Sequence, residues 1–214
     1  MLKTAPCYSK KDYYEFYAID FTDKKVLDIG SSIGSFQKSS RFKDSSKSIG
    51  SAKKYLTMDI NPDSGADIVG DAHNLPFKEN EFDIIIANNV IEHFYNPAKA
   101  TSEMKRVLKK GGLVYYTIPF LYPIHEAPHD YVRFTRFGIE KIFENFNITT
   151  TYSRGGFFST TALYIYKMTH VLDSVKLGVL FRAIITPILW LWVQLDRLDT
   201  SEAFVRVYFG KAVK

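Results

Sequence analysis

Polar side chains follow four successive apolar segments of this 214-residue chain, at the point where each segment ends. Asp28 and Gly30 close the first segment, Asp59 closes the second, Asp71 follows the third and Asn88 follows the fourth. Ligands of an open parallel sheet bind outside the carboxyl ends of its strands, and a carboxylate there can accept hydrogen bonds from ribose hydroxyls. The series therefore predicts a binding site for a nucleoside-containing cofactor.

Periodicity and turn residues predict the elements that must position these groups. Short apolar runs bounded by Gly or Asn-Pro indicate strands at residues 25–29, 55–60, 66–69, 82–87 and 112–118. An amphipathic helix is expected over 97–110, because Pro97 stands in its first turn and Gly111 follows it. A helix from Arg136, a strand over 147–152 and a closing strand over 203–213 complete the series. We predict an α/β fold with a Rossmann-like, doubly wound, mostly parallel seven-stranded sheet.

Length and composition fit a single domain over residues 1–214. A chain of this size is long enough for one substantial core, and its 46% hydrophobic and 24% charged residues are ordinary for a globular protein. We expect a lead-in over 1–24, a ligand-binding core over 25–152, an apolar helical insertion over 157–201 and a closing strand over 203–213.

The charge pattern argues against a nucleic-acid partner. The net charge of +5 is mild, and the Lys/Ser-rich stretch over 37–54 contains Asp44 and is typical of a solvated loop. The single cysteine, Cys7, excludes an intramolecular disulfide and a multi-cysteine zinc site. The first residues contain no apolar run of the kind found in secretory signals, so we expect a cytoplasmic protein.

The first strand end resembles a known motif. The string VLDIGSSIGSF is similar to motif I of class I S-adenosylmethionine-dependent methyltransferases, in particular the small-molecule enzymes of the methyltransferase domain 11 type. Asp28, Gly30 and Gly34 match that motif, whereas Ser32 replaces its middle glycine. The segments YLTMDINP, GDAHNLPF, FDIIIANNVIEHF and EMKRVLKKGGLVYYTIPF resemble the later motifs in order, so the resemblance covers about residues 20–150.

This resemblance implies S-adenosylmethionine as the cofactor and assigns residues to it. Asp59 would accept both ribose hydroxyls with Ile60 beside it, Asp71 and Ala72 would lie at the adenine, and Asn88 would lie near the methionine moiety. The expected cofactor-binding residues are Asp28, Gly30, Ser32, Gly34, Asp59, Ile60, Asp71, Ala72 and Asn88. The same carboxylate could serve NAD, but the string G-S-S-I-G-S lacks the G-x-G-x-x-G spacing of a pyrophosphate cradle.

The segment after the fifth strand is where this fold positions its acceptor. PFLYPIHEAPHDYVRFTRFG resembles an H-x-x-P-x-D-Y-x-R-F-T pattern of small-molecule methyltransferases, several of which act in glycan or lipid biosynthesis. We predict catalytic roles for His129, His125 and Asp130, together with His93 on the helix that follows the fourth strand. Alternatively, His93 is a histidine on the helix surface or in a packing contact, with no catalytic role.

Two alternatives apply to the acceptor loop itself. Asp130 and Arg133 could act only to pin the loop. The cluster from His125 to Asp130 could also hold a metal ion, but Pro128 disfavours a regular helical ligand pair, and we expect no metal.

A long apolar stretch interrupts the end of the chain. Residues 171–195 include IITPILWLWV with Trp190 and Trp192, which are typical of a membrane interface, but Pro187 and early charges interrupt the run as a spanning helix. This stretch is compatible with two arrangements. Residues 177–193 could contact the inner membrane face peripherally, or the stretch could be buried in the core or in a dimer interface. An apolar insertion beside the acceptor side favours a hydrophobic or lipid-linked substrate.

The leading interpretation is methyl transfer from S-adenosylmethionine to a small-molecule, glycan or lipid-linked acceptor at O, N or C. Two alternatives stay open. A catalytically silent cofactor-binding or partner module is compatible with Ser32 in the motif and the lack of an unmistakable base. An NAD-dependent oxidoreductase is disfavoured by the absent phosphate loop.

Overall fold

A computed structural model describes residues 19–31, 49–170, 178–199, 201 and 203–214. Cys7, Ser32 and Gly34 lie outside the described residues, so the predicted roles of Ser32 and Gly34 stay predictions.

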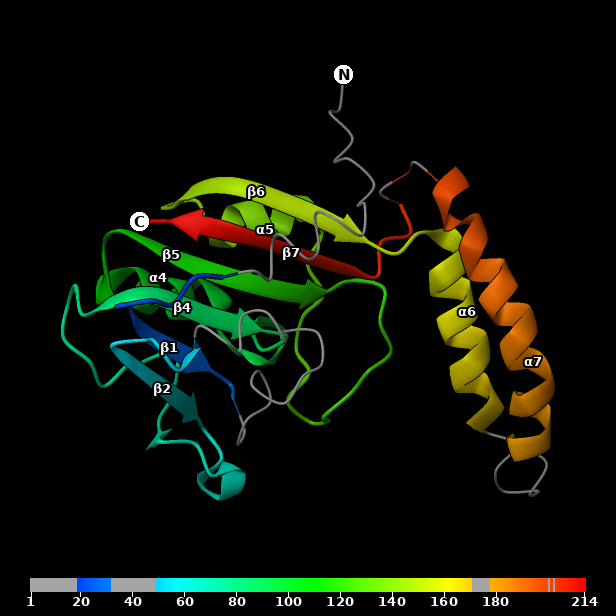
Figure 1. Cartoon of the computed structure of the whole chain (residues 1–214), viewed down its shortest axis with the longest axis horizontal. Helices are drawn as coiled ribbons and strands as arrows, with labels where there is room; N and C mark the ends of the chain where they lie inside the picture. The colour runs from blue at the N-terminus through cyan, green and yellow to red at the C-terminus, as the bar shows by residue number, and fades with distance from the viewer. Residues whose placement is uncertain (1–18, 32–48, 171–177, 200, 202) are drawn as a thin grey trace.

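The centre of the protein is a seven-stranded sheet with the order β3-β2-β1-β4-β5-β7-β6 (Figure 1). Strands β1 to β5 pair in parallel, whereas β7 is antiparallel to both β5 and β6. Their bounds are β1 Lys25–Ile29, β2 Lys54–Asp59, β3 Ile68–Val69, β4 Phe82–Asn88, β5 Leu108–Pro119, β6 Asn147–Arg154 and β7 Val207–Val213. The predicted α/β class and mostly parallel Rossmann-like sheet are confirmed.

Apolar side chains alternate between the two faces of the sheet. On one face Leu27 and Ile85 belong to one buried cluster with residues of helix α4 (Pro97–Val107) and helix α5 (Arg136–Ile142). On the other face Val26 and Ile84 join a second cluster with Phe21 from the lead-in. Because neighbouring residues of a strand point to opposite faces, the continuous apolar runs of β1 and β4 are those of strands buried on both sides.

Helix α4 begins where the sequence predicts, because the side chain of Asn96 accepts the amide of Lys99 and Pro97 occupies the first turn. Its predicted end at residue 110 is wrong. The helix stops at Val107, and Leu108 already pairs with Phe82 of β4, so β5 begins four residues earlier than predicted. Sheet pairing decides this boundary, which a helical pattern alone cannot locate.

The closing strand is also shorter than predicted, since β7 begins at Val207 and not at residue 203. The predicted strand over residues 66–69 is reduced to the two residues of β3, at the edge of the sheet.

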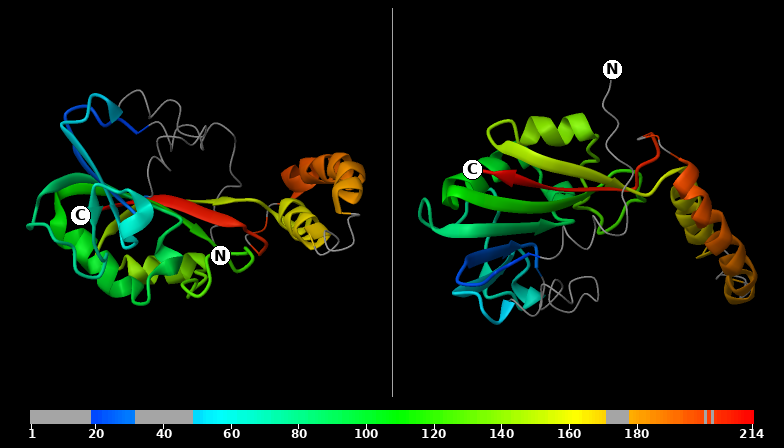
Figure 2. Two further views of the ribbon diagram at one scale, coloured as in Figure 1. Left: turned by 90° about the horizontal axis from the view of Figure 1, so that it is seen from below. Right: turned by 45° about the horizontal axis from the view of Figure 1, so that its top comes forward.

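The apolar insertion forms a pair of helices between β6 and β7, as predicted. Helices α6 (Phe157–Met168) and α7 (Gly178–Val193) lie side by side at one end of the sheet and not on its faces (Figure 2). A short 3₁₀ helix, η5 (Gln194–Leu198), follows α7 and returns the chain to the start of α6. There Asp196 accepts the amide of Ser159 at 2.9 Å and Asp199 accepts that of Phe157 at 2.6 Å.

These carboxylates act as caps at the amino end of α6. Acidic groups are favourable there because unsatisfied amides and the helix dipole attract negative charge. The side chain of Trp192 adds a second link between the helices, donating to Thr161 Oγ1 at 2.9 Å.

Candidate functional site

The strand ends predicted to bind a cofactor meet at one edge of the sheet. The register places Ile29 of β1 beside Met58 of β2 and Ala87 of β4. Gly30, Asp59 and Asn88 are the next residues along these three parallel strands, so they come together at the carboxyl edge. Asp59 in turn lies beside Val69 at the end of β3.

The turn after β1 requires glycine at position 30. Gly30 has a φ of +72°, and a Cβ added there would lie 2.3 Å from Cγ2 of Val90. The amides of Gly30 and Ser31 both donate to the carbonyl of Met58, at 2.8 and 3.3 Å. The turn is therefore held against β2, and its backbone packs directly against the side chain of Val90 in the loop after β4.

Asp28 is a buried residue of β1 two positions before the glycine of this turn. Its side chain is buried, and the hydroxyl of Tyr55 donates to Oδ2 at 2.8 Å. Burial raises the pKa of Asp28 to about 7, while hydrogen bonds from Tyr55 and Ser31 act in the opposite direction. Asp28 therefore positions the turn, and its predicted contact with the cofactor stays a prediction.

Asp59 and Ile60 stand at the open end of β2. Oδ1 of Asp59 accepts the amide of Asn61 at 2.9 Å, which orients the carboxylate. The neighbouring Ile60 side chain is 68% exposed. An oriented carboxylate beside an uncovered apolar side chain is suited to a ribose with an attached base.

Asp71 belongs to a network that the sequence did not predict. Its Oδ1 accepts both the amide and Nδ1 of His73, and its Oδ2 lies 3.4 Å from the hydroxyl of Tyr95. Although partial burial opposes it, these hydrogen bonds lower the pKa of Asp71. The ring of Tyr95 stacks on that of His73 at 3.7 Å between centroids, and Ala72 is buried beside them.

Asn88 is held by the neighbouring strand. The hydroxyl of Thr117 on β5 lies 2.6 Å from Oδ1 of Asn88 and 2.9 Å from Oδ1 of Asn89. Because this contact uses the side-chain oxygen of Asn88, its amide nitrogen can donate to a ligand.

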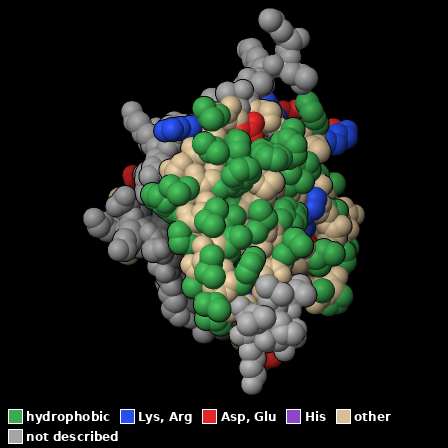
Figure 3. Space-filling model, turned by 90° about the vertical axis from the view of Figure 1, so that its right-hand side faces the viewer, with side chains coloured by type: hydrophobic (Ala, Val, Ile, Leu, Met, Phe, Trp, Pro, Cys, Tyr) green, Lys and Arg blue, Asp and Glu red, His purple; other side chains and the backbone are tan. Residues whose placement is uncertain are grey.

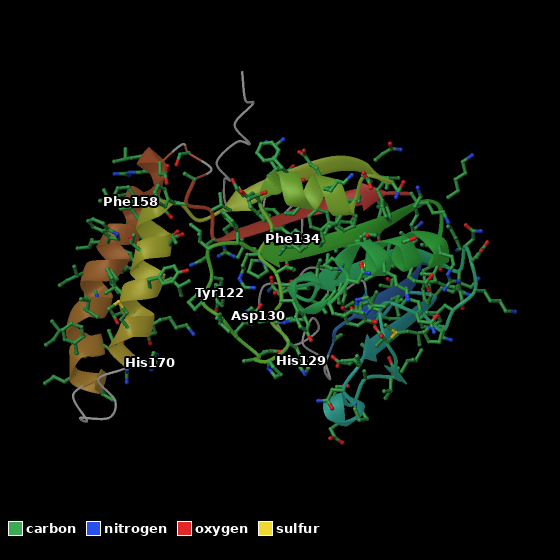
Figure 4. All side chains as sticks on the ribbon, turned by 180° about the vertical axis from the view of Figure 1, so that it is seen from behind. Tyr122, His129, Asp130, Phe134, Phe158 and His170 are labelled. Carbon is green, nitrogen blue, oxygen red and sulfur yellow. The ribbon has the colours of Figure 1, made fainter. Side chains whose placement is uncertain are left out.

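The acceptor loop runs from β5 to α5 and lies between the sheet and α6 (Figure 4). Its central feature is a bidentate ion pair, in which Arg133 Nη1 and Nη2 donate to the two oxygens of Asp130. The Asp130 side chain is only 2% exposed, and the hydrogen bonds from Arg133 hold the pKa of Asp130 well below its usual range. Arg133 also donates to the carbonyls of Tyr122 and Pro123, which ties both arms of the loop together.

This geometry supports the pinning alternative for Asp130. A carboxylate engaged on both oxygens by a guanidinium is a poor proton acceptor, so the geometry favours positioning over catalysis for Asp130, and its catalytic role stays a prediction. His129 is exposed, and its Nδ1 lies 3.0 Å from the hydroxyl of Tyr131.

The structure brings two of the predicted histidines together. The rings of His93 and His125 are 4.9 Å apart between centroids, although 32 positions separate them in the chain. His93 lies on a short 3₁₀ helix, η3 (Ile91–His93), directly after β4, so the helix predicted to follow this strand is a single turn. The amides of Tyr131 and Val132 donate to the carbonyl of Glu92, so the acceptor loop docks on η3.

Glu92 is the residue that sequence reasoning missed. Its side chain is fully buried between the two histidines, and burial raises its pKa to about 8. The only signal in the sequence is a Glu-His pair directly after a strand end. The cluster from His125 to Asp130, considered above as a metal site, is not what the fold assembles, because Asp130 is engaged by Arg133 while His125 Nε2 faces Glu92.

Comparison with known proteins gives consistent matches. Residues 27–116 match the model of a family described as a methyltransferase domain. A demethylmenaquinone methyltransferase of Thermotoga maritima is 32% identical over 104 residues, which is 44% of this chain and 43% of that protein. The uncharacterized methyltransferase YcgJ of Bacillus subtilis is 41% identical over 61 residues, covering 28% of this chain and 22% of that protein.

Solved structures give a likeness of fold. An S-adenosylmethionine-dependent methyltransferase from Mesorhizobium loti superposes with a TM-score of 0.58 at 12% identity, covering 94% of this chain and 95% of that one. The chain spans less than half the length of the curated relatives it matches, from 16% to 43%.

Proposed function

We propose that this chain, whose residues 27–116 match a methyltransferase domain, is a class I S-adenosylmethionine-dependent enzyme that transfers the methyl group of this cofactor to a small, lipid-linked acceptor. The observation that carries the proposal is the convergence of Gly30, Asp59 and Asn88 at one edge of the sheet, directly beside the acceptor loop.

The residues at this edge fit the cofactor. The turn at Gly30 packs directly against the side chain of Val90, which fixes its backbone at the carboxyl edge where the cofactor would bind. Asp59 would accept the ribose hydroxyls, and Asn88 would donate to the methionine moiety. Ile60, Ala72 and Asp71 would surround the adenine; these groups match a nucleoside joined to an amino acid better than any phosphate.

Methyl transfer needs positioning more than it needs acid–base chemistry. The reaction is an in-line displacement at a sulfonium, and holding both reactants in one geometry supplies much of the acceleration. The ion pair between Asp130 and Arg133 would serve this purpose, since it fixes the loop that borders the cofactor edge. Tyr122 and His125 of the same loop lie in edge contact at 5.3 Å between ring centroids.

The helix pair supports a lipid-linked acceptor. The surface formed by α6 and α7 is mainly hydrophobic (Figure 3), and eight large apolar side chains of α7 are exposed: Val179, Leu180, Phe181, Ile184, Ile188, Trp190, Leu191 and Trp192. A soluble surface rarely keeps such a patch uncovered unless it binds something. Among the described residues, Gly178–Leu198 is long and apolar enough to cross a membrane: an 18-residue window of it has a mean hydropathy of 1.6, and only 11% of that window is buried.

We assign this surface to the membrane interface. Tryptophan is enriched at the headgroup level, and the side chain of Trp190 is 65% exposed. The chain's net charge of +5 favours an anionic lipid surface. The helix pair adjoins the acceptor loop, so a membrane-bound substrate would be presented beside the cofactor edge.

Binding of the cofactor is tested by calorimetric titration with S-adenosylmethionine, S-adenosylhomocysteine and NAD. Replacing Asp59 by Ala removes two charge-assisted hydrogen bonds, so we expect affinity for S-adenosylmethionine to fall about 100-fold. Asp63→Ala, an exposed carboxylate four residues further on, should leave the affinity unchanged. Tighter binding of NAD than of S-adenosylmethionine would refute the proposal.

Turnover is tested with methyl-labelled S-adenosylmethionine and separate lipid and water-soluble extracts. Label in the lipid fraction supports the proposed acceptor. Label only in the water-soluble fraction would correct the acceptor class, and cofactor binding without labelling of either fraction would favour a silent module.

Membrane contact is tested by flotation with vesicles that contain phosphatidylglycerol. The double variant Ile184→Ser/Ile188→Ser removes two exposed side chains of α7 and should abolish flotation. Val69→Ser, an equally exposed position on β3, should float like the unmodified chain. A stable dimer that does not float would show that a second copy covers the surface.

A further inference from the structure

Glu92 has an unusual position for a carboxylate. Its side chain is completely buried, and neither oxygen has a hydrogen-bond partner among the residues that the structure describes. Burying an unpaired charge is strongly unfavourable, so buried carboxylates are normally paired, protonated or bound to metal.

Two imidazoles face this carboxylate. Nε2 of His93 lies 3.8 Å and Nε2 of His125 lies 3.7 Å from Oε1 of Glu92. These separations are too long for hydrogen bonds, yet the three candidate ligand atoms all lie within 4.8 Å of one another. Bonds of about 2.1 Å in tetrahedral geometry place neighbouring ligand atoms about 3.4 Å apart, so modest side-chain rotation would bring all three onto one ion.

The opposite ring nitrogen of His93 has the kind of partner that metal-bound histidines require. Nδ1 of His93 donates to the carbonyl of His129 at 2.7 Å, which leaves its Nε2 as the lone-pair nitrogen facing Glu92. Nδ1 of His125 lies 3.4 Å from the acceptor Oδ2 of Asp130 and also 3.4 Å from Nη2 of Arg133, so donation to Asp130 would require a small rotation of the ring. Histidine ligands commonly donate their second N–H to a carbonyl or a carboxylate in this way, which fixes both tautomer and ring orientation.

We propose that Glu92, His93 and His125 bind a divalent transition-metal ion. One carboxylate and two imidazoles suit zinc, iron, cobalt or manganese, whereas magnesium prefers oxygen ligands alone. Three protein ligands leave a coordination position for a further oxygen or nitrogen atom.

The place of this cluster in the fold suggests what that atom is. Glu92 and His93 follow β4, and His125 follows the neighbouring strand β5, so the cluster lies at the same edge as Asn88. Resting on the proposed function, the ion would orient a hydroxyl, amine or carboxylate of the acceptor and lower the pKa of a bound hydroxyl. The residues that looked catalytic in sequence, His129 and Asp130, would then hold the ligands in place.

The test is titration of the full chain with Co²⁺ after dialysis against a chelator, followed by visible absorption and calorimetry. We expect one Co²⁺ per chain, displacement by Zn²⁺ and no competition from Mg²⁺. Glu92→Gln, which keeps the shape of the side chain, and His125→Gln should each weaken binding at least tenfold. His170→Gln, an exposed histidine just after α6, is the matched control and should bind Co²⁺ like the unmodified chain.

Circular dichroism of each variant separates loss of the site from loss of the fold. If Glu92→Gln fails to fold, His125→Gln decides the result, because that side chain is partly exposed. Absence of Co²⁺ binding by the folded chain, or equal affinity in folded Glu92→Gln, would overturn the proposal. Calorimetry with S-adenosylmethionine is independent of this titration. Cofactor binding and turnover without Co²⁺ binding would refute the metal site alone, and Co²⁺ binding without turnover would refute the proposed function alone.

Discussion

The buried carboxylate of Asp28 predicts an unusual pH dependence of stability. Burial raises its pKa from 3.8 to about 7 in the folded chain, so between these values the unfolded chain has released a proton that the folded chain retains. Stability contributed by this group is therefore present below pH 4 and is lost as the pH rises through 7. Asp28→Asn carries no such proton, and its amide oxygen can still accept the hydroxyl of Tyr55.

The magnitude follows from the two pKa values. One pH unit corresponds to about 1.36 kcal/mol, so the full interval corresponds to about 4 kcal/mol at most. Of this, about 2–3 kcal/mol falls between pH 5 and pH 8. We expect the free energy of unfolding of Asp28→Asn, relative to the unmodified chain, to rise by up to that amount across this range.

The assay is urea unfolding at pH 5, 6, 7 and 8, followed by circular dichroism. Asp83→Asn is the control, because the pKa of Asp83 is lowered in the folded chain whereas that of Asp28 is raised. Although partial burial opposes it, Lys109 and the amide of Lys25 lower the pKa of Asp83, so its contribution is constant above pH 5 and its loss should destabilise the chain equally at all four values. A difference between Asp28→Asn and the unmodified chain that does not change with pH would refute the burial argument.

Two further substitutions probe the turn and the acceptor loop. Gly30→Ala places an alanine at a positive φ, which alone costs about 1–2 kcal/mol, and its Cβ also clashes with Val90. Calorimetry should therefore show at least tenfold weaker binding of S-adenosylmethionine. The control is Gly50→Ala, which has open space around it and should bind the cofactor normally. Arg133→Gln leaves the buried Asp130 unpaired and should destabilise the chain by about 3 kcal/mol in thermal unfolding. The exposed pair made by Lys141 is the comparison, since Lys141→Gln should cost less than about 1 kcal/mol. Equal losses in the two charge variants would contradict the burial assigned to Asp130.

The position of the helical insertion is consistent with the proposed function. Asp196 and Asp199 join the end of the helix pair to its beginning, so α6 and α7 form one unit rather than two loose segments. That unit stands at the end of the sheet where the acceptor loop also lies (Figures 1 and 4). The surface proposed to contact lipid and the loop proposed to position the acceptor are therefore neighbours.

Local patterns in the sequence determined the framework of this protein. β1 lies where it was predicted and β4 extends one residue further, because their apolar runs are long enough to be buried on both faces and end in clear turn residues. The order of Asp59, Asp71 and Asn88 at successive strand ends was enough to indicate the cofactor edge, since parallel strands bring their carboxyl ends together.

Only the tertiary structure decided how individual polar groups are used. The sequence predicts Asp28 as a cofactor ligand, yet in the structure its carboxylate is buried and accepts a hydrogen bond from the hydroxyl of Tyr55. Glu92 carries no distinguishing local pattern, and its importance comes from burial between His93 and His125. The desolvation of a carboxylate and the distance between two imidazoles depend on the paths of loops that join different strands, and no periodicity within one segment encodes them.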